Sequence, residues 1–179
     1  YSESKNTEQI VKRMQLISER YARILVVRVD LSYLLKCQVQ VNIQTFHDNM
    51  RVLRRRFQDQ DTIFKGLIEY AWALEQGENK GYHCHLLLVY NGRERRNAYS
   101  VANRVGKLWS MITEDQGCHF NCHTADYLKQ FSDRNRLGIG MIHRKNPDEV
   151  NNMLNTIKYL VRPEKEAQHL RVKTKKRMR

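Results

Sequence analysis

The sequence predicts an α+β domain in which helices cover a central antiparallel sheet. Two observations support this fold class: a β-branched run at residues 24–31, and two further strand-like segments joined by a turn. Amphipathic helices precede, separate and follow these segments, so each face of the sheet has a candidate cover. The chain has 179 residues, which suits one domain of ordinary size.

The first half of the chain predicts a helix, a strand and a second helix. Residues 4–20 place Ile10, Met14 and Ile17 on one side at helical spacing. The run ILVVRVDL at 24–31 is typical of a buried central strand. Helical spacing then returns with the apolar residues Phe46, Met50, Leu53 and Phe57.

The second half predicts a hairpin, a helix, short strands and a last helix. The hairpin pairs part of 63–75 with 83–90 across the turn-rich stretch QGENKGY. A helix is expected at 98–112, with extended pieces at 119–123 and 139–143 and the loop SDRNR between them. A helix entered at Pro147 continues to Pro163.

This pattern divides the chain into an N-terminal helix at 1–22, a main domain at 23–163 and a basic C-terminal tail at 164–179. No apolar run is long enough to span a bilayer and no signal peptide opens the chain, so we expect a cytoplasmic protein without a membrane partner. The four cysteines are too sparse to suggest a disulfide framework.

The charge balance predicts a polyanionic partner. The chain carries 32 Lys and Arg against 19 Asp and Glu, a formal net charge of +13. Nucleic acid is favoured over an anionic membrane surface because no strongly amphipathic basic helix is present.

Two histidines one residue apart predict a metal site. His83 and His85 point to the same face of a strand, and Glu75 has the same parity across the turn. Two imidazoles and a carboxylate suit Mg²⁺ or Mn²⁺ acting on a phosphate. Glu69 has the same parity but lies six residues further back along the strand, which makes it the poorer candidate. The alternative is a pair of histidines on a half-exposed strand face without a ligand.

Tyr159 lies almost opposite the apolar stripe of the last helix. Lys158 precedes it and Arg162 follows about one turn later, so cations flank the phenol and can bind a phosphate beside it. The alternative is an ordinary surface tyrosine on a basic helix.

Taken together, these features resemble the HUH endonucleases. Within that superfamily, VVRVDL, EQGENKGYHCHLLLVYNG and IKYLVRPEK resemble the inovirus-type replication-initiation proteins of filamentous phages and prophages, over residues 23–162. One departure is Arg162, where such proteins usually carry Lys. Arg does not exchange protons near neutrality, so any acid-base role falls to Lys158 or water.

The resemblance implies an HUH endonuclease-like fold and a replication initiator of the rolling-circle type in the cytoplasm of a bacterial host. Glu75, His83 and His85 would hold the divalent metal, and Tyr159 would attack a phosphate of single-stranded or melted origin DNA. The products would be a 5′-phosphotyrosine link and a free 3′-hydroxyl, which host replication machinery can extend. Candidates for the DNA-binding surface are Arg51, Arg54, Arg55, Arg93, Arg95, Arg96 and Arg162.

Three other interpretations remain open at this point. One is a zinc-binding structural protein built on Cys118, His119, Cys122 and His123, although this spacing is too compact for the usual knuckles. A second is a non-catalytic DNA-binding module with the same fold. A third is a metal-dependent hydrolase that uses water in place of Tyr159.

Overall fold

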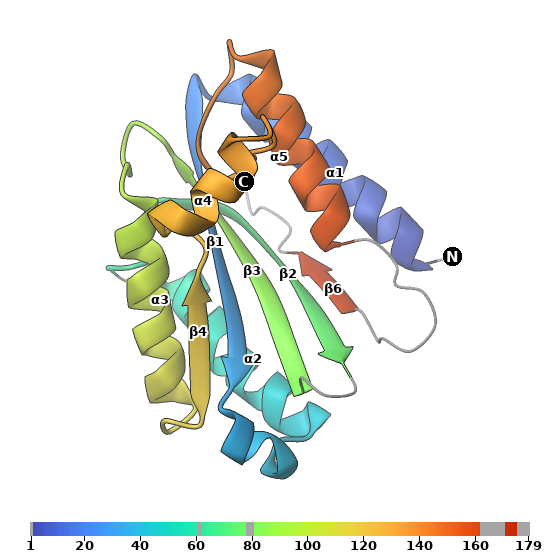
Figure 1. The fold of residues 1–179 in the computed structure, drawn as a ribbon, viewed down its shortest axis with the longest axis vertical. Helices are drawn as coiled ribbons and strands as arrows, with labels where there is room; N and C mark the ends of the chain where they lie inside the picture. Colours follow the sequence, from blue (N-terminus) through green and yellow to red (C-terminus); the bar gives the residue numbers. More distant parts are fainter. Residues whose placement is uncertain (1, 61, 78–80, 162–170, 175–179) are drawn as a thin grey trace.

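A computed structural model describes residues 2–60, 62–77, 81–161 and 171–174. It is an α+β fold built on a six-stranded sheet in which the strand pairs of the described residues are antiparallel. The strand order is β4-β1-β3-β2-β6, and β5 also pairs with β1 (Figure 1).

The elements alternate between the sheet and its helical covers. In chain order they are α1 (Ser2–Arg20), β1 (Arg23–Tyr33), η1 (Leu35–Gln40), α2 (Ile43–Asp59), β2 (Leu67–Gly77), β3 (Gly81–Asn91), α3 (Ala98–Ile112), β4 (Gly117–Asn121), α4 (Ala125–Ser132), β5 (Gly140–His143), α5 (Pro147–Leu160) and β6 (Arg171–Thr174).

β1 is the centre of the sheet, as its β-branched sequence predicts. One edge pairs with β3 from Ile24 to Leu31. The other edge is shared, because β5 pairs with Arg23–Val26 and β4 with Val29–Tyr33. A strand with partners on both edges and helices on both faces buries almost every side chain, which explains why the run is apolar except at Arg28 and Asp30.

The predicted hairpin is confirmed as β2 and β3. Their register places Glu75 opposite His83 and Ala73 opposite His85. A register shift between Leu67 and Glu69 marks a bulge near the start of β2.

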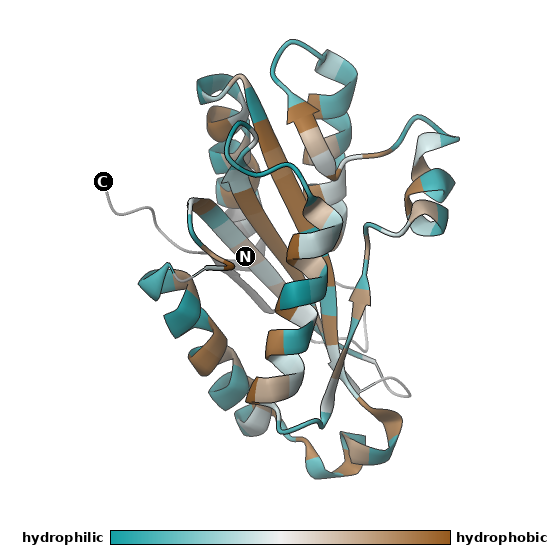
Figure 2. Ribbon diagram, turned by 90° about the vertical axis from the view of Figure 1, so that its left-hand side faces the viewer, coloured by the Kyte–Doolittle hydropathy of each residue, from teal (hydrophilic) through white to brown (hydrophobic). Residues whose placement is uncertain are grey.

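Helices cover the two faces of the sheet differently. One apolar cluster joins odd-numbered residues of β1 and even-numbered residues of β2 and β3 to α2 and α3. The other joins the opposite faces of the same strands to α1 and α5. Figure 2 shows apolar strands lying between helices whose colour alternates along their length, as expected for amphipathic covers.

Asparagine side chains begin three of the helices. Asn42 forms a capping box with Thr45 at α2, and Asn97 and Asn146 accept hydrogen bonds from backbone N–H groups in the first turns of α3 and α5. Pro147 then occupies the first helical position of α5, as predicted. These caps fix where α5 starts and therefore which residues reach its far end.

The structure adds three elements that the sequence did not predict. α4 lies in the stretch before the expected loop SDRNR, of which only Ser132 is helical. Its apolar residues span little more than two turns, too few for helical periodicity to be recognised. The 3₁₀ segment η1 follows β1, and β6 pairs with β2 inside the stretch expected to be only a basic tail. No helix among the described residues is long and apolar enough to cross a membrane.

Candidate active site

Four polar side chains interrupt the apolar pattern on the face of the sheet that α1 and α5 cover. Glu75 lies opposite His83 in the β2–β3 pair, and Asp30 lies opposite His85 in the β1–β3 pair. Because side chains alternate across a strand, all four belong to the same face. The parity argument from the sequence is therefore confirmed for the register of Glu75, His83 and His85.

His85 lies between two carboxylates. Its Nδ1 is 2.9 Å from Oδ1 of Asp30, and its Nε2 is 3.1 Å from Oε2 of Glu75. The three side chains are 18–28% exposed, with Glu75 the most accessible. A neutral imidazole has one N–H and donates to one carboxylate only. The second contact therefore needs either a proton or another cation between Nε2 and Glu75.

The pKa directions agree with this arrangement. Burial acts to lower the pKa of His85, but hydrogen bonds and charge from Asp30, with the contact to Glu75, raise it overall. Burial acts to raise the pKa of Asp30, but the hydrogen bond from His85 and the charge of Arg28 lower it overall. Asp30 is thus a carboxylate that holds Nδ1 protonated and leaves Nε2 facing Glu75.

Arg28 completes the fixed charges beneath this site. Its guanidinium donates to both carboxylate oxygens of Asp30, each at 3.1 Å, and lies 5.8 Å from the ring centroid of Tyr127. Burial lowers the pKa of Arg28, but the charge of Asp30 outweighs it and raises that pKa overall. The pair is therefore ionised, and Asp30 is held in one orientation.

An open cleft of about 920 Å³ brings the histidine and the tyrosine together. Glu75 and His85 line it from the sheet, and Tyr159 lines it from the last turn of α5. Tyr159 is 62% exposed, so its phenol is accessible from solvent. Residues 84 positions apart in the chain, Glu75 and Tyr159, thus share one cavity.

α5 presents one apolar face and one polar face. Met153, Ile157 and Leu160 are buried against the sheet. Four polar residues of α5 that line the cleft are three or four positions apart and therefore lie on one side of the helix: Asn152, Asn155, Thr156 and Tyr159. Amide and hydroxyl groups in this row can hydrogen-bond the edges of bases or the oxygens of a phosphate backbone.

The unpredicted helix α4 supplies an aromatic wall to the same cleft. Tyr127 and Phe131 line it, with ring centroids 5.0 Å apart. Phe120 at the end of β4 stands 5.2 Å from Tyr127 and is 48% exposed. An accessible row of aromatic rings offers stacking surfaces to unpaired bases.

The donor set fits a divalent cation in part. Among the described residues no group of three or more His, Cys, Asp or Glu side chains is gathered as a ready ligand set. Yet Nε2 of His83 is buried without a hydrogen-bond partner in the described part of the chain. The 3.1 Å separation of His85 Nε2 and Glu75 Oε2 also matches two adjacent ligands of an octahedral ion with bonds of about 2.1 Å. His83 lies opposite Glu75 in the strand register but is not among the residues that line the cleft.

Other predicted site residues lie elsewhere. Lys158 is exposed on α5 and is not among the residues lining the cleft, and Arg162 lies outside the described residues. The arginines expected on the DNA-binding surface are split between two places. On α2, which covers the opposite face of the sheet, are Arg51, Arg54 and Arg55; in the segment after β3 are Arg93, Arg95 and Arg96.

Arg95 has a structural role in that segment. Its guanidinium donates to the backbone carbonyls of Thr62 and Lys65 and lies 5.2 Å from the ring centroid of Tyr90. It therefore ties the end of β3 to the loop before β2.

Sequence reasoning missed the residues that support the cleft, namely Asp30, Arg28 and Arg136. Arg28 and Arg136 line the cleft, and Asp30 contacts His85. The available signal was the charged pair inside the run ILVVRVDL, since Arg and Asp two residues apart on a buried strand must face a common polar site.

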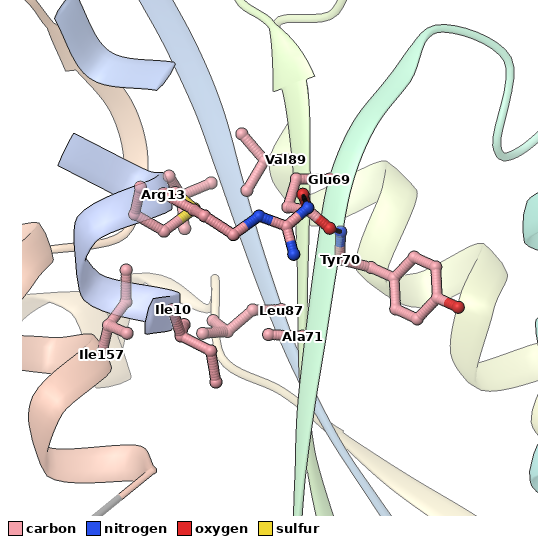
Figure 3. A pocket seen from close by; sticks show the side chains of 10 residues that line it. Ile10, Arg13, Glu69, Tyr70, Ala71, Leu87, Val89 and Ile157 are labelled. Carbon is pink, nitrogen blue, oxygen red and sulfur yellow. Dashed lines mark hydrogen bonds and ion pairs between the residues drawn. The ribbon is translucent and has the colours of Figure 1, made fainter. Parts of the chain in front are cut away.

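Glu69, judged the poorer ligand from its spacing, has a different partner. Arg13 of α1 reaches across the apolar layer and donates to its carboxylate (Figure 3). The Glu69 carboxylate also accepts a hydrogen bond from the N–H of Tyr70. This partly buried ion pair fastens α1 to β2 away from the cleft that Tyr159 lines.

The compact Cys/His segment is used to pack the sheet. Nε2 of His123 accepts a hydrogen bond from the N–H of Arg28 at 2.9 Å, in the gap between the β4 and β5 pairings. Cys118 contacts the hydroxyl of Ser32, and the ring of His119 packs over Gly106. Within the described residues these side chains do not form a metal-binding group, so the zinc interpretation has no support.

Comparison with known proteins identifies the family of the chain. No curated protein and no solved structure matches it. One family model, described as the YagK/YfjJ C-terminal domain, matches residues 2–176. The match takes in α1, the complete sheet and α5, and therefore all the residues of the cleft. The chain belongs to the YagK/YfjJ C-terminal domain family.

Proposed function

We propose that this domain is an HUH-type nicking and joining endonuclease that acts on single-stranded or melted DNA through Tyr159. The observation that carries the proposal is the shared cleft, in which an accessible tyrosine meets Glu75 and His85 from two sheet strands. A non-catalytic DNA-binding module needs a basic surface but has no need for this juxtaposition.

The lining of the cleft favours an unpaired strand as substrate. Tyr127 and Phe131 offer ring faces to bases, and the Asn and Thr side chains of α5 offer hydrogen bonds. Arg136 supplies positive charge at the same cavity, where the charge of Arg28 is paired with Asp30, and the chain as a whole carries +13. A base-paired duplex would hide the base faces that these rings can stack on.

The proposed reaction is a transesterification. The phenolic oxygen of Tyr159 forms a bond to phosphorus, and the bond from phosphorus to the 3′-oxygen breaks. The phenolic proton passes to water or to a neighbouring base, and the departing 3′-oxygen takes up a proton to become a hydroxyl. The products are a 5′-phosphotyrosine and a free 3′-end. Because one phosphodiester replaces another, the same residues can rejoin the ends.

Glu75, His83 and His85 are the residues that would hold a divalent cation, Mg²⁺ or Mn²⁺. Bound there, it would supply positive charge beside the phosphate. Asp30 orients His85 through Nδ1, so Nε2 is directed toward Glu75. Arg28 keeps Asp30 ionised.

The decisive test is the formation of a covalent protein–DNA adduct. Purified protein is incubated with Mn²⁺ and end-labelled single-stranded oligonucleotides pooled over many sequences, and the products are separated on denaturing gels. We expect a slow band that carries the 3′ part of the strand and is lost in Tyr159→Phe. Tyr99→Phe is the matched control, because Tyr99 is also exposed and lies on α3 across the sheet.

The other outcomes separate the competing functions. Cleavage without an adduct, equal in Tyr159→Phe and the parent protein, would indicate a hydrolase that uses water. Binding of the oligonucleotide pool without cleavage or adduct would favour a non-catalytic DNA-binding module. An adduct that persists in Tyr159→Phe would show that another residue is the nucleophile.

A further inference from the structure

A second basic pocket lies at the end of the sheet where β1 begins and β3 ends, at the upper end in Figure 1. It has a volume of about 250 Å³ and is lined by Arg20, Tyr21, Ala22, Asn91, Arg93 and Arg144. The three arginines come from the end of α1, the segment after β3 and the segment after β5. The fold therefore brings cations together from three distant parts of the chain.

Backbone hydrogen bonds hold these segments in place. The N–H of Arg144 donates to the carbonyl of Ala22, and Nη1 of Arg144 donates to the carbonyl of Glu19, 3.2 Å away. The N–H of Gly92 donates to the carbonyl of Arg23. The pocket is therefore built into the end of the sheet.

The positive charge of this pocket is not balanced by carboxylates. Within the described part of the chain, none of Arg20, Arg93 and Arg144 forms a salt bridge. Glu19 precedes Arg20 and Glu94 follows Arg93, but among the described residues neither carboxylate forms a salt bridge with the three arginines, and that of Glu94 lies against Gly66. Three guanidinium groups that share a pocket repel one another unless an anion lies between them.

We propose that this pocket binds a backbone phosphate of single-stranded DNA, at a site separate from the cleft lined by Tyr159. Guanidinium groups match phosphate oxygens in fork geometry, and three of them can surround one phosphate. The ring of Tyr21, with the Arg20 guanidinium 5.8 Å from its centroid, lies beside the phosphate position and can contact the adjoining sugar or base.

The position of the pocket favours a polynucleotide over a small anion. His85 and Asn91 are on the same strand, and their separation corresponds to roughly 20 Å at the rise of an extended chain. A strand held in the cleft therefore reaches the pocket after several nucleotides. The pocket would hold the strand beyond the cleavage point. The choice of single-stranded DNA as the ligand rests on the proposed function, but the pocket needs only to bind the strand and takes no part in cleavage.

The test measures binding in a protein that cannot react. The triple variant Arg20→Gln/Arg93→Gln/Arg144→Gln is made in the Tyr159→Phe background. We measure its affinity for a labelled single strand of about 20 nucleotides by fluorescence anisotropy over a range of salt concentrations. This length is greater than the roughly 4–16 nucleotides that a small single-strand-binding domain usually covers. We expect the affinity to fall about tenfold at low salt. We also expect the negative slope of log K against log salt to become shallower by about 0.7 per lost phosphate contact.

A matched variant removes the same charge from another surface. Arg51→Gln/Arg54→Gln/Arg55→Gln changes α2, on the face of the sheet opposite the cleft. We expect its affinity and salt slope to stay close to those of the parent protein. An equal loss in both triple variants would show an effect of net charge alone and would overturn the pocket proposal.

Two further measurements separate the possible failures. Inorganic phosphate is titrated at constant ionic strength; if it saturates the pocket at low concentration while the pocket variant binds DNA normally, the site serves a small anion and the proposal is wrong. Adduct formation is then compared at saturating DNA with Tyr159 restored. Normal adduct yield with weakened binding supports the pocket, whereas an absent adduct in the parent protein counts only against the proposed reaction.

Discussion

Oδ1 of Asp30 lies 2.9 Å from Nδ1 of His85, across the central pair of strands. This contact fixes which imidazole nitrogen is protonated and turns the other toward Glu75 at 3.1 Å. Asp30 is in turn held by two hydrogen bonds from Arg28. The site therefore depends on a chain of charges that begins inside the sheet.

Replacing Asp30 with Asn should weaken metal binding and also lower the stability of the domain, because the buried Arg28 loses its counter-charge. The amide oxygen can still accept from Nδ1, but the charge that raises the pKa and basicity of His85 is lost. We expect the affinity for Mn²⁺, measured by calorimetric titration, to fall about 10- to 100-fold. Asp48→Asn, on the exposed surface of α2, is the control and should leave it unchanged. Equal affinity in Asp30→Asn would contradict a supporting role for this carboxylate.

Replacing His83 with Ala should show whether this histidine binds a metal ion or only packs the hairpin. Saturating Mn²⁺, at about 100 times the dissociation constant, stabilises a folded protein by about 2.7 kcal/mol. For a domain of this size that corresponds to a rise in melting temperature of about 5–10 °C over the value with chelator. We expect His83→Ala to remove this rise. If the variant melts lower than the parent but gains equally from Mn²⁺, His83 only packs the end of the hairpin.

Much of the fold could be predicted because its longest elements carry strong patterns. The buried β1 sequence, the two strand-like segments that form β2 and β3, and the apolar stripe of α5 each predicted an element that the structure contains. Alternation along β2 and β3 also predicted that Glu75 lies opposite His83. These relationships are local, so the spacing of residues in the chain is enough to define them.

The remaining parts of the site depend on contacts between distant segments. Nothing in the spacing of Tyr127 or Arg136 indicates that α4 and its following loop border the same cleft as Tyr159. Likewise, the partner of Glu69 is Arg13, which a strand pattern cannot reveal. A charge run was a poor guide as well, since Arg51 and its neighbours on α2 lie across the sheet from the cleft.

Gly138 should be required for the placement of α5, the helix that carries Tyr159. A Cβ at this position would lie 2.2 Å from the carbonyl oxygen of Asn152 and 2.3 Å from the hydroxyl of Thr156, both on α5. Because the first obstacle is backbone, Gly138→Ala must displace α5 or the loop, at a cost of about 1–3 kcal/mol in the free energy of unfolding. We expect a loss of stability in urea together with slower adduct formation.

Gly140 provides the comparison for that variant. A Cβ there meets nothing within 4 Å, but its φ of +87° disfavours a side chain. Gly140→Ala should therefore cost about 1 kcal/mol through backbone strain and leave the rate of adduct formation unchanged. Equal effects of both substitutions on that rate would show that close packing of Gly138 against α5 does not position Tyr159.

His123 should make the stability of the domain depend on pH. Burial, with the nearby charge of Arg28, lowers the pKa of His123 from 6.5 to about 4. Above pH 6.5 the histidine is neutral in both folded and unfolded chains, so this group does not lower the free energy of unfolding there. As pH falls from 6.5 toward 4, the unfolded chain binds the proton first and stability declines, by at most about 3 kcal/mol from this group. His123→Gln keeps an acceptor for the N–H of Arg28 and should flatten the urea-unfolding profile in this range. A His123→Gln profile as steep as that of the parent would assign the pH dependence to other groups.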